Sequence, residues 1–110
     1  MRKDIDCIIS PKSIAVVGAT NRPGSVGLAT FKNLLRAGYQ GVLYPVNPKS
    51  KSIQGVKAYP SLTDVPDDVD LAVIIVSPEI VPSVVEEATQ KQVKGCVVAD
   101  SRILLSGEEG

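Results

Sequence analysis

IAVVGATNRPGSVG, residues 14–27, is the stretch of this sequence that decides its fold. Its first four residues are apolar and largely β-branched, which predicts a buried strand. The ten residues from Gly18 to Gly27 are polar and glycine-rich, which predicts a turn. Apolar side chains then recur at helical spacing within residues 28–35. A strand, a glycine-rich turn and a helix in this order predict the first unit of an α/β fold.

The alternation of strands and helices continues along the rest of the chain. We expect further strands at residues 42–46, 55–59, 71–76 and 95–99. A second helix follows residue 78, and its expected buried stripe is Ile80, Val81, Val84, Val85 and Ala88. Pro45 lacks an amide donor, so its strand is not expected to be paired fully on both sides. The pattern predicts a Rossmann-like, doubly wound and mainly parallel sheet in a single domain.

Length and charge limit the classes of function that are open to this chain. Its 110 residues favour one domain, and its 44% hydrophobic content argues against disorder. Twelve basic and twelve acidic residues cancel, so no net charge attracts nucleic acid or an anionic membrane surface. The amino terminus has no signal-peptide pattern, and no apolar run is long enough to span a membrane. We therefore expect a cytoplasmic protein with neither a nucleic acid nor a membrane as partner.

The two cysteines and the lack of histidine argue against metal and redox sites. Cys7 and Cys96 are far apart in the sequence, and two cysteines without histidine do not make a standard zinc site. Cys96 stands between Gly95 and Val97, where we expect it to be a small buried apolar residue. We therefore expect no metal ligands in this chain.

The glycine-rich turn is the expected ligand-binding loop. Glycines allow tight turns and close approach of the backbone, and the amides at the start of the next helix favour a phosphate group. The spacing departs from the G-x-G-x-x-G pattern of dinucleotide sites, which leaves room for a bulkier phosphate group. The expected binding residues in this loop are Gly18, Ala19, Thr20, Asn21, Gly24, Ser25, Val26 and Gly27.

The end of the second strand bears on which ligand is bound. An NAD site has an acidic residue there, which holds the ribose hydroxyls. This chain has Asn47, Pro48 and Lys49 instead, with no carboxylate nearby. A lysine at this place favours a phosphorylated ribose, which points to coenzyme A, with its 3′-phosphate, or to NADP; the alternative for Lys49 is a solvated surface lysine.

A third part of the site is expected after the strand at residues 71–76. Val76, Ser77 and Pro78 follow it at the carboxyl edge of the sheet and could line a groove for adenine or pantetheine. The same residues also suit the start of a helix, with Ser77 as N-cap and Pro78 as the first helical residue. These two roles are compatible.

Nearly the whole chain resembles one protein family. Its matching segments, in order, are PKSIAVVGA (residues 11–19), YPVNPK (44–49), YPSL (59–62), VDLAVI (69–74), the helix at 81–88, and the closing GEEG (107–110). These segments resemble the amino-terminal coenzyme A-binding domain of NDP-forming acyl-CoA synthetases, relatives of the succinyl-CoA synthetase α subunit.

The resemblance implies a function for the chain and for a longer protein. It implies that residues 1–110 are one domain that binds coenzyme A or acyl-CoA and belongs to a longer, multidomain protein. In this family, acyl-CoA, nucleoside diphosphate and phosphate interconvert with acid, coenzyme A and nucleoside triphosphate. The phosphohistidine of that reaction lies on later domains or subunits. The chain has no histidine, so we expect no catalytic residue here and an acid–thiol ligase activity only in the full-length protein.

The resemblance also implies the site, with one departure. Residues 18–27 and Lys49 would hold phosphates of coenzyme A, and residues 76–78 would face the nucleotide or pantetheine. Between Asp100 and Ser106 the chain departs from the family, with Arg102 where a glycine is usual and Leu105 where an acid is usual. Two alternative functions remain: a regulatory or stand-alone coenzyme A-binding domain, such as one beside a protein acetyltransferase, and the NADP-binding domain of an oxidoreductase.

Overall fold

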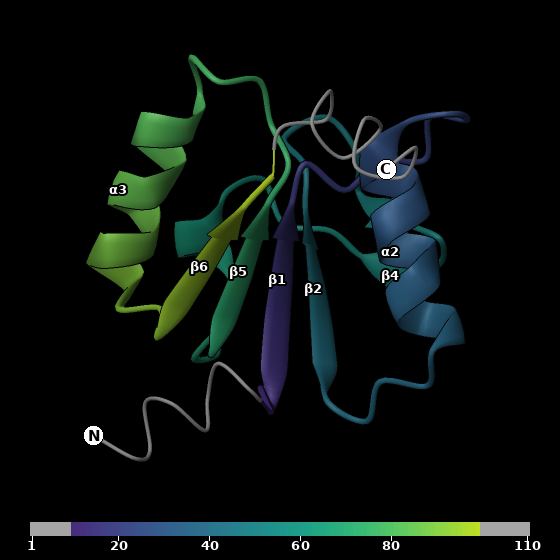
Figure 1. The fold of residues 1–110 in the computed structure, drawn as a ribbon, viewed down its shortest axis with the longest axis horizontal. Coiled ribbons are helices and arrows are strands. Elements are labelled where there is room, and N and C mark those ends of the chain that lie inside the picture. Colours follow the sequence, from purple (N-terminus) through teal and green to yellow (C-terminus); the bar gives the residue numbers. More distant parts are fainter. Residues whose placement is uncertain (1–9, 100–110) are drawn as a thin grey trace, which may run out of the picture.

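The computed structural model describes residues 10–99, which form a four-stranded parallel sheet with helices on both faces (Figure 1). The strands lie in the order β2-β1-β5-β6. Their bounds are Ser13–Val17 for β1, Val42–Val46 for β2, Leu71–Ile74 for β5 and Gly95–Val98 for β6. The chain leaves β1 toward one side to form β2 and later returns to the other side to form β5, which is the doubly wound arrangement. The predicted Rossmann-like class is confirmed.

β1 is an inner strand of the sheet, and all five of its residues are buried. It pairs in parallel with β2 on one side and β5 on the other, with Ile14 opposite Leu43 and Leu71. β2 is an edge strand of this sheet, which explains why Pro45 is tolerated within it. The carboxyl ends of β1, β2 and β5 therefore meet at one edge of the molecule.

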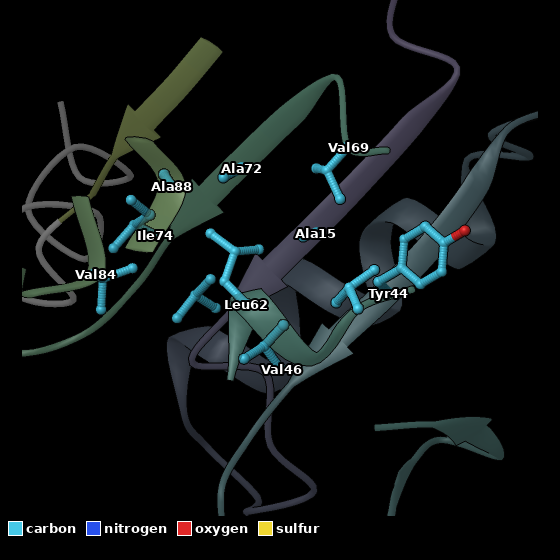
Figure 2. Close-up of a cluster of buried hydrophobic side chains, with 11 residues drawn as sticks. Ala15, Tyr44, Val46, Leu62, Val69, Ala72, Ile74, Val84 and Ala88 are labelled. Carbon is cyan, nitrogen blue, oxygen red and sulfur yellow. The ribbon is translucent and has the colours of Figure 1, made fainter. Parts of the chain in front are cut away.

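The first face of the sheet is covered by α3 (Val81–Lys91) and the 3₁₀ helix η1 (Leu62–Asp64). Figure 2 shows their side chains Leu62, Val84 and Ala88 gathered with those of the sheet. Its core consists of Ala15, Val17, Tyr44, Val46, Leu62, Val65, Val69, Ala72, Ile74, Val84 and Ala88. Within this core the Tyr44 hydroxyl donates a 2.7 Å hydrogen bond to Asp67. Burial, together with this hydrogen bond, raises the pKa of Tyr44 to about 12. The phenol therefore stays neutral throughout the physiological pH range.

The second face is covered by α2 (Val26–Arg36) and a small hairpin of β3 (Ser52–Ile53) and β4 (Val56–Lys57). Phe31 of α2 and Ile53 of β3 are fully buried together on this face. The expected strand at 55–59 is only partly right, because its regular part is β4, which pairs antiparallel with β3. Gln54 and Gly55 between them both have positive φ, as a type I′ hairpin turn requires.

α3 begins later, and is buried less, than the sequence predicts. Its N-cap is Ile80, so Ser77 and Pro78 form a preceding turn rather than the cap and first residue. Val84 and Ala88 are buried, whereas Ile80 is 46% exposed and Val85 is 37% exposed. The wide stripe expected from the sequence is wrong at these two positions, because only one narrow face of the helix contacts the sheet.

The prediction that Cys96 is buried is also wrong. Cys96 is exposed, and its neighbours Val97 and Val98 are 48% and 49% exposed. Cys96 pairs with Ala72 of the inner strand β5, but β6 itself is an edge strand with a neighbour on one side only. An edge strand leaves its outer flank uncovered even when its sequence is apolar. Cys7 and residues 100–106, also considered above, lie outside the described residues.

Within residues 10–99, no helix is long and apolar enough to cross a membrane. The same part of the chain contains no cluster of three or more histidine, cysteine, aspartate or glutamate residues suited to a metal ion.

Candidate functional site

A cavity of about 360 Å³ opens at the carboxyl edge of the sheet. It lies between the ends of β1 and β2, the segment after β5, and the first turns of α3. Its lining residues are Val17, Gly18, Val46, Asn47, Pro48, Lys49, Pro60, Ser61, Val76, Ile80, Ser83, Val84 and Glu87. The lining is mainly apolar, with a few polar groups, as is usual for a small-molecule site.

Five of the residues expected from the sequence line this cavity together. They are Gly18, Asn47, Pro48, Lys49 and Val76, which follow three different strands. The remaining expected residues do not line it: Ala19, Thr20, Asn21, Gly24 and Ser25 continue the loop toward α2, Val26 and Gly27 begin α2, and Ser77 and Pro78 form the turn before α3. The loop and the cavity share Gly18, so they are adjacent parts of one edge.

The glycines at the two ends of the loop are required by close backbone contacts. Gly18 has a φ of +101°, and a Cβ on it would overlap the carbonyl oxygen of Ile75 after β5. A Cβ on Gly27, in the first turn of α2, would overlap the carbonyl oxygen of Gly18. The start of α2 is thus packed directly against the end of β1, which brings its amides to the sheet edge.

The start of α2 offers backbone donors for an anion. Ser25 is the N-cap, and its hydroxyl accepts from the Leu28 amide at 3.2 Å while donating to the Arg22 carbonyl at 2.8 Å. Among residues 10–99, the amides of Val26 and Gly27 donate to no other group. Free amides at a helix start, together with the helix dipole, favour a phosphate.

Two asparagines of the expected site have side chains that bond within the protein. Asn47 bonds to the loop at Ala19 and to the backbone of Lys49. Asn21 bonds to the β3–β4 hairpin at Ser52 and Gln54. Lys49 itself is exposed at the cavity wall. Of the cavity-lining residues named above, Lys49 carries the positive charge.

Sequence reasoning missed the wall of the cavity that η1 and α3 provide. Pro60 and Ser61 precede η1, while Ile80, Ser83, Val84 and Glu87 come from α3 or the residue before it. Glu87 is held in place because its Oε1 accepts from the Leu62 amide at 3.1 Å. The segment YPSL was the available signal, since it resembles the family although no role in the site was expected for it.

Known proteins resemble this chain over almost its whole length. A model of the CoA-binding domain family matches residues 12–104. The chain is 43% identical over 107 residues to ADP-forming acetate–CoA ligase II of Archaeoglobus fulgidus, covering 97% of this chain and 16% of that one. It is 44% identical over 110 residues to the α subunit of ADP-forming acetate–CoA ligase I of Pyrococcus furiosus, covering 96% of this chain and 24% of that one.

A solved structure agrees with these relatives. The apo form of a dinucleotide-forming acetyl-coenzyme A synthetase 1 from Ca. Korarchaeum cryptofilum superposes with a TM-score of 0.83 at 40% identity, covering 86% of this chain and 20% of that one. The chain thus spans between 16% and 24% of the length of these three proteins. The resemblance inferred from the sequence motifs is confirmed. The chain belongs to the CoA-binding domain family, and its ligand is coenzyme A.

Proposed function

We propose that coenzyme A lies across the carboxyl edge of the sheet, with its pyrophosphate at the loop of residues 18–27 and its 3′-phosphate at Lys49. The observation that carries this proposal is that Gly18, Lys49 and Val76, from three strand ends, line one cavity. The free amides of Val26 and Gly27 at the start of α2 suit the pyrophosphate. The exposed ammonium of Lys49 suits a second, separate phosphate.

The cavity beside Lys49 is the proposed seat of the adenine ring. The 3′-phosphate and adenine are both attached to the same ribose, so a cation that binds that phosphate must lie near the base. Val46, Val76 and Val84 supply apolar surface for the ring, and Ser83 and Glu87 supply polar groups at its edge. The pantetheine arm would then leave along the turn at Ser77 and Pro78, which lies outside the cavity.

For the whole protein, we propose an ADP-forming acid–CoA ligase, in which acid, coenzyme A and ATP interconvert with acyl-CoA, ADP and phosphate. The two acetate–CoA ligases support this proposal through their identity over nearly all of the chain. Residues 1–110 would be one coenzyme A-binding domain that works with further domains or subunits carrying the phosphoryl relay. We place the protein in the cytoplasm, where coenzyme A and ATP are both abundant.

Titration by calorimetry with coenzyme A, dephospho-coenzyme A and NADPH tests the site. We expect coenzyme A to bind best, and Lys49→Ala to weaken it about ten- to a hundredfold, since a hydrogen bond to a charged group contributes roughly 1.5–3 kcal/mol. Dephospho-coenzyme A lacks the 3′-phosphate, so Lys49→Ala should change its affinity little.

Lys94→Ala is the matched control for this titration. Lys94 is exposed and directly precedes β6, at the opposite edge of the sheet, so its removal should affect neither ligand. If Lys49→Ala weakens the binding of coenzyme A and dephospho-coenzyme A by the same factor, the 3′-phosphate is held elsewhere. NADPH binding without coenzyme A binding would favour the oxidoreductase alternative.

A further inference from the structure

Asn47 joins three segments of the candidate site. It directly follows β2, and its backbone amide donates to the Tyr59 carbonyl at 2.9 Å. Its side-chain Nδ2 donates to the Ala19 carbonyl in the glycine-rich loop at 2.9 Å. Its Oδ1 accepts from the backbone amide of Lys49 at 2.7 Å. Both polar atoms of the side chain are therefore engaged by the protein.

The chemistry of these two side-chain bonds requires an asparagine. One partner, the Ala19 carbonyl, is an acceptor, and the other, the Lys49 amide, is a donor. Only a side chain with a donor and an acceptor on the same planar group satisfies both at this reach. Aspartate would face the Ala19 carbonyl with a second acceptor, and alanine would satisfy neither partner.

The two bonds determine how far the loop lies from Lys49. The first bond holds the loop at Ala19, next to Gly18, whose amide donates to the Val46 carbonyl at 3.1 Å. The second bond closes an Asx turn over Pro48, whose ring restricts φ, and so places the Cα of Lys49. Ala19 is fully buried, which leaves the loop little room to shift while the amide bond persists.

We propose that Asn47 is a positioning residue, which sets the spacing between the glycine-rich loop and Lys49 and thereby the preference for a 3′-phosphorylated ligand. It acts through the loop and the lysine, because both polar atoms of its side chain already bond to the protein and are not free to hold a polar group of the ligand. This inference rests on the proposed function, which places the pyrophosphate at the glycine-rich loop and the 3′-phosphate at Lys49, the two segments that Asn47 connects. This role replaces a direct hydrogen bond to the ligand, although Asn47 still lines the cavity.

The first test uses amide hydrogen exchange, measured by NMR on the ligand-free protein. In Asn47→Ala, we expect exchange at residues 19–22 and at Lys49 to accelerate about tenfold or more, because both bonds are lost. In Asn47→Asp, the acceptor for the Lys49 amide remains and the donor to Ala19 is lost. We expect faster exchange in the loop only, which a general loss of stability would not produce.

The second test measures affinity for coenzyme A and dephospho-coenzyme A. Asn47→Ala should weaken coenzyme A about tenfold or more, as expected for the loss of one or two net hydrogen bonds. The preference for coenzyme A over dephospho-coenzyme A, measured as the ratio of their affinities, should shrink because Lys49 loses its fixed position. Asn33→Ala, at an exposed position of α2, is the control and should change the affinity for neither ligand.

Three results would overturn the inference. Weaker binding with unchanged exchange in the ligand-free variants would mean that Asn47 contacts the ligand directly. Unchanged exchange and unchanged affinity would mean that the bonds at Ala19 and Lys49 have no role. If the ratio of the affinities for coenzyme A and dephospho-coenzyme A is unaltered in Asn47→Ala, Asn47 does not set the preference for a 3′-phosphorylated ligand. If the wild-type protein binds no coenzyme A, the proposed function fails, and the exchange pattern still shows separately whether Asn47 joins the loop to Lys49.

Discussion

Gly24 lies in the middle of the glycine-rich loop of residues 18–27, and a glycine is needed there for a different physical reason from that at Gly18 and Gly27. Its φ is +79°, a left-handed conformation that other residues rarely adopt, yet a Cβ there would have nothing within 4 Å. Gly27 has ordinary backbone angles but no space for a Cβ, because the Gly18 carbonyl occupies it. Gly24 thus shapes the loop, and Gly27 allows helix and sheet to pack.

Alanine substitutions should separate these two roles. Gly24→Ala should lower the free energy of unfolding by about 1–2 kcal/mol, the strain of a left-handed alanine, and weaken coenzyme A because the loop shifts. Gly27→Ala should destabilise the fold more, near or above the upper end of the roughly 1–3 kcal/mol typical of overpacking. Urea unfolding and calorimetric titration of each variant measure both quantities.

Gly38→Ala is the matched control for Gly24→Ala. Gly38 has a φ of +74° and equally open surroundings, but it follows the carboxyl end of α2, far from the loop. The Gly38→Ala variant should lose about as much free energy of unfolding as Gly24→Ala and keep its affinity for coenzyme A. A Gly27→Ala variant as stable as the wild type would contradict the packing role assigned to Gly27.

At the scale of elements, the β3–β4 hairpin supports the glycine-rich loop from the second face of the sheet. Asn21 in the loop donates from Nδ2 to the Ser52 carbonyl at 2.9 Å. Its Oδ1 accepts from the Gln54 backbone amide at 3.0 Å and from Gln54 Nε2 at 3.1 Å. Ile53 anchors the hairpin in the core beneath α2. The loop is therefore tied to a buried element.

Asn21→Ala should loosen the hairpin turn and the loop together. We expect the free energy of unfolding to fall by about 1 kcal/mol, because the lost bonds are exposed, and amide exchange at Gln54 to accelerate. Gln54→Ala removes the side-chain bond alone and keeps the backbone bond, so it should have a smaller effect on both quantities. Unchanged exchange at Gln54 in Asn21→Ala would show that the hairpin holds its turn without the loop.

At the scale of the whole molecule, we propose that this chain supplies the coenzyme A site and that other domains or subunits supply the groups for chemistry. The resemblance places the phosphohistidine on later domains, and this sequence contains no histidine. The proposed ligase activity therefore depends on parts that the ligases have beyond the 16–24% of their length matched here.

The purified 110-residue chain should bind coenzyme A and form no acyl-CoA. Thiol consumption in the presence of acetate, ATP and Mg²⁺ measures the reaction, and a complete ADP-forming acetate–CoA ligase serves as the positive control. Acid-dependent loss of the coenzyme A thiol with this chain alone would contradict the assignment of catalysis to other domains.

The sequence by itself determined the strand–loop–helix unit, the parallel sheet and Lys49 as the candidate cation. Each of these follows from a local pattern, because strand and helix periods and glycine turns are set by neighbouring residues. The ends of parallel strands also meet at one edge whatever the details of packing. For this reason the pattern of residue types is enough to place Gly18, Lys49 and Val76 at the same edge of the sheet.

Only the tertiary structure decided three features: the cavity wall that η1 and α3 provide, the exposure of Cys96 and the hydrogen-bond partners of Asn47. Glu87 bonds to a residue 25 positions away, and the Asn47 side-chain amide bonds to one 28 positions away. Cys96 has the apolar neighbours of a buried strand, yet β6 lies at a sheet edge. These features depend on which segments the strand order brings together, and a local pattern of residue types does not carry that information.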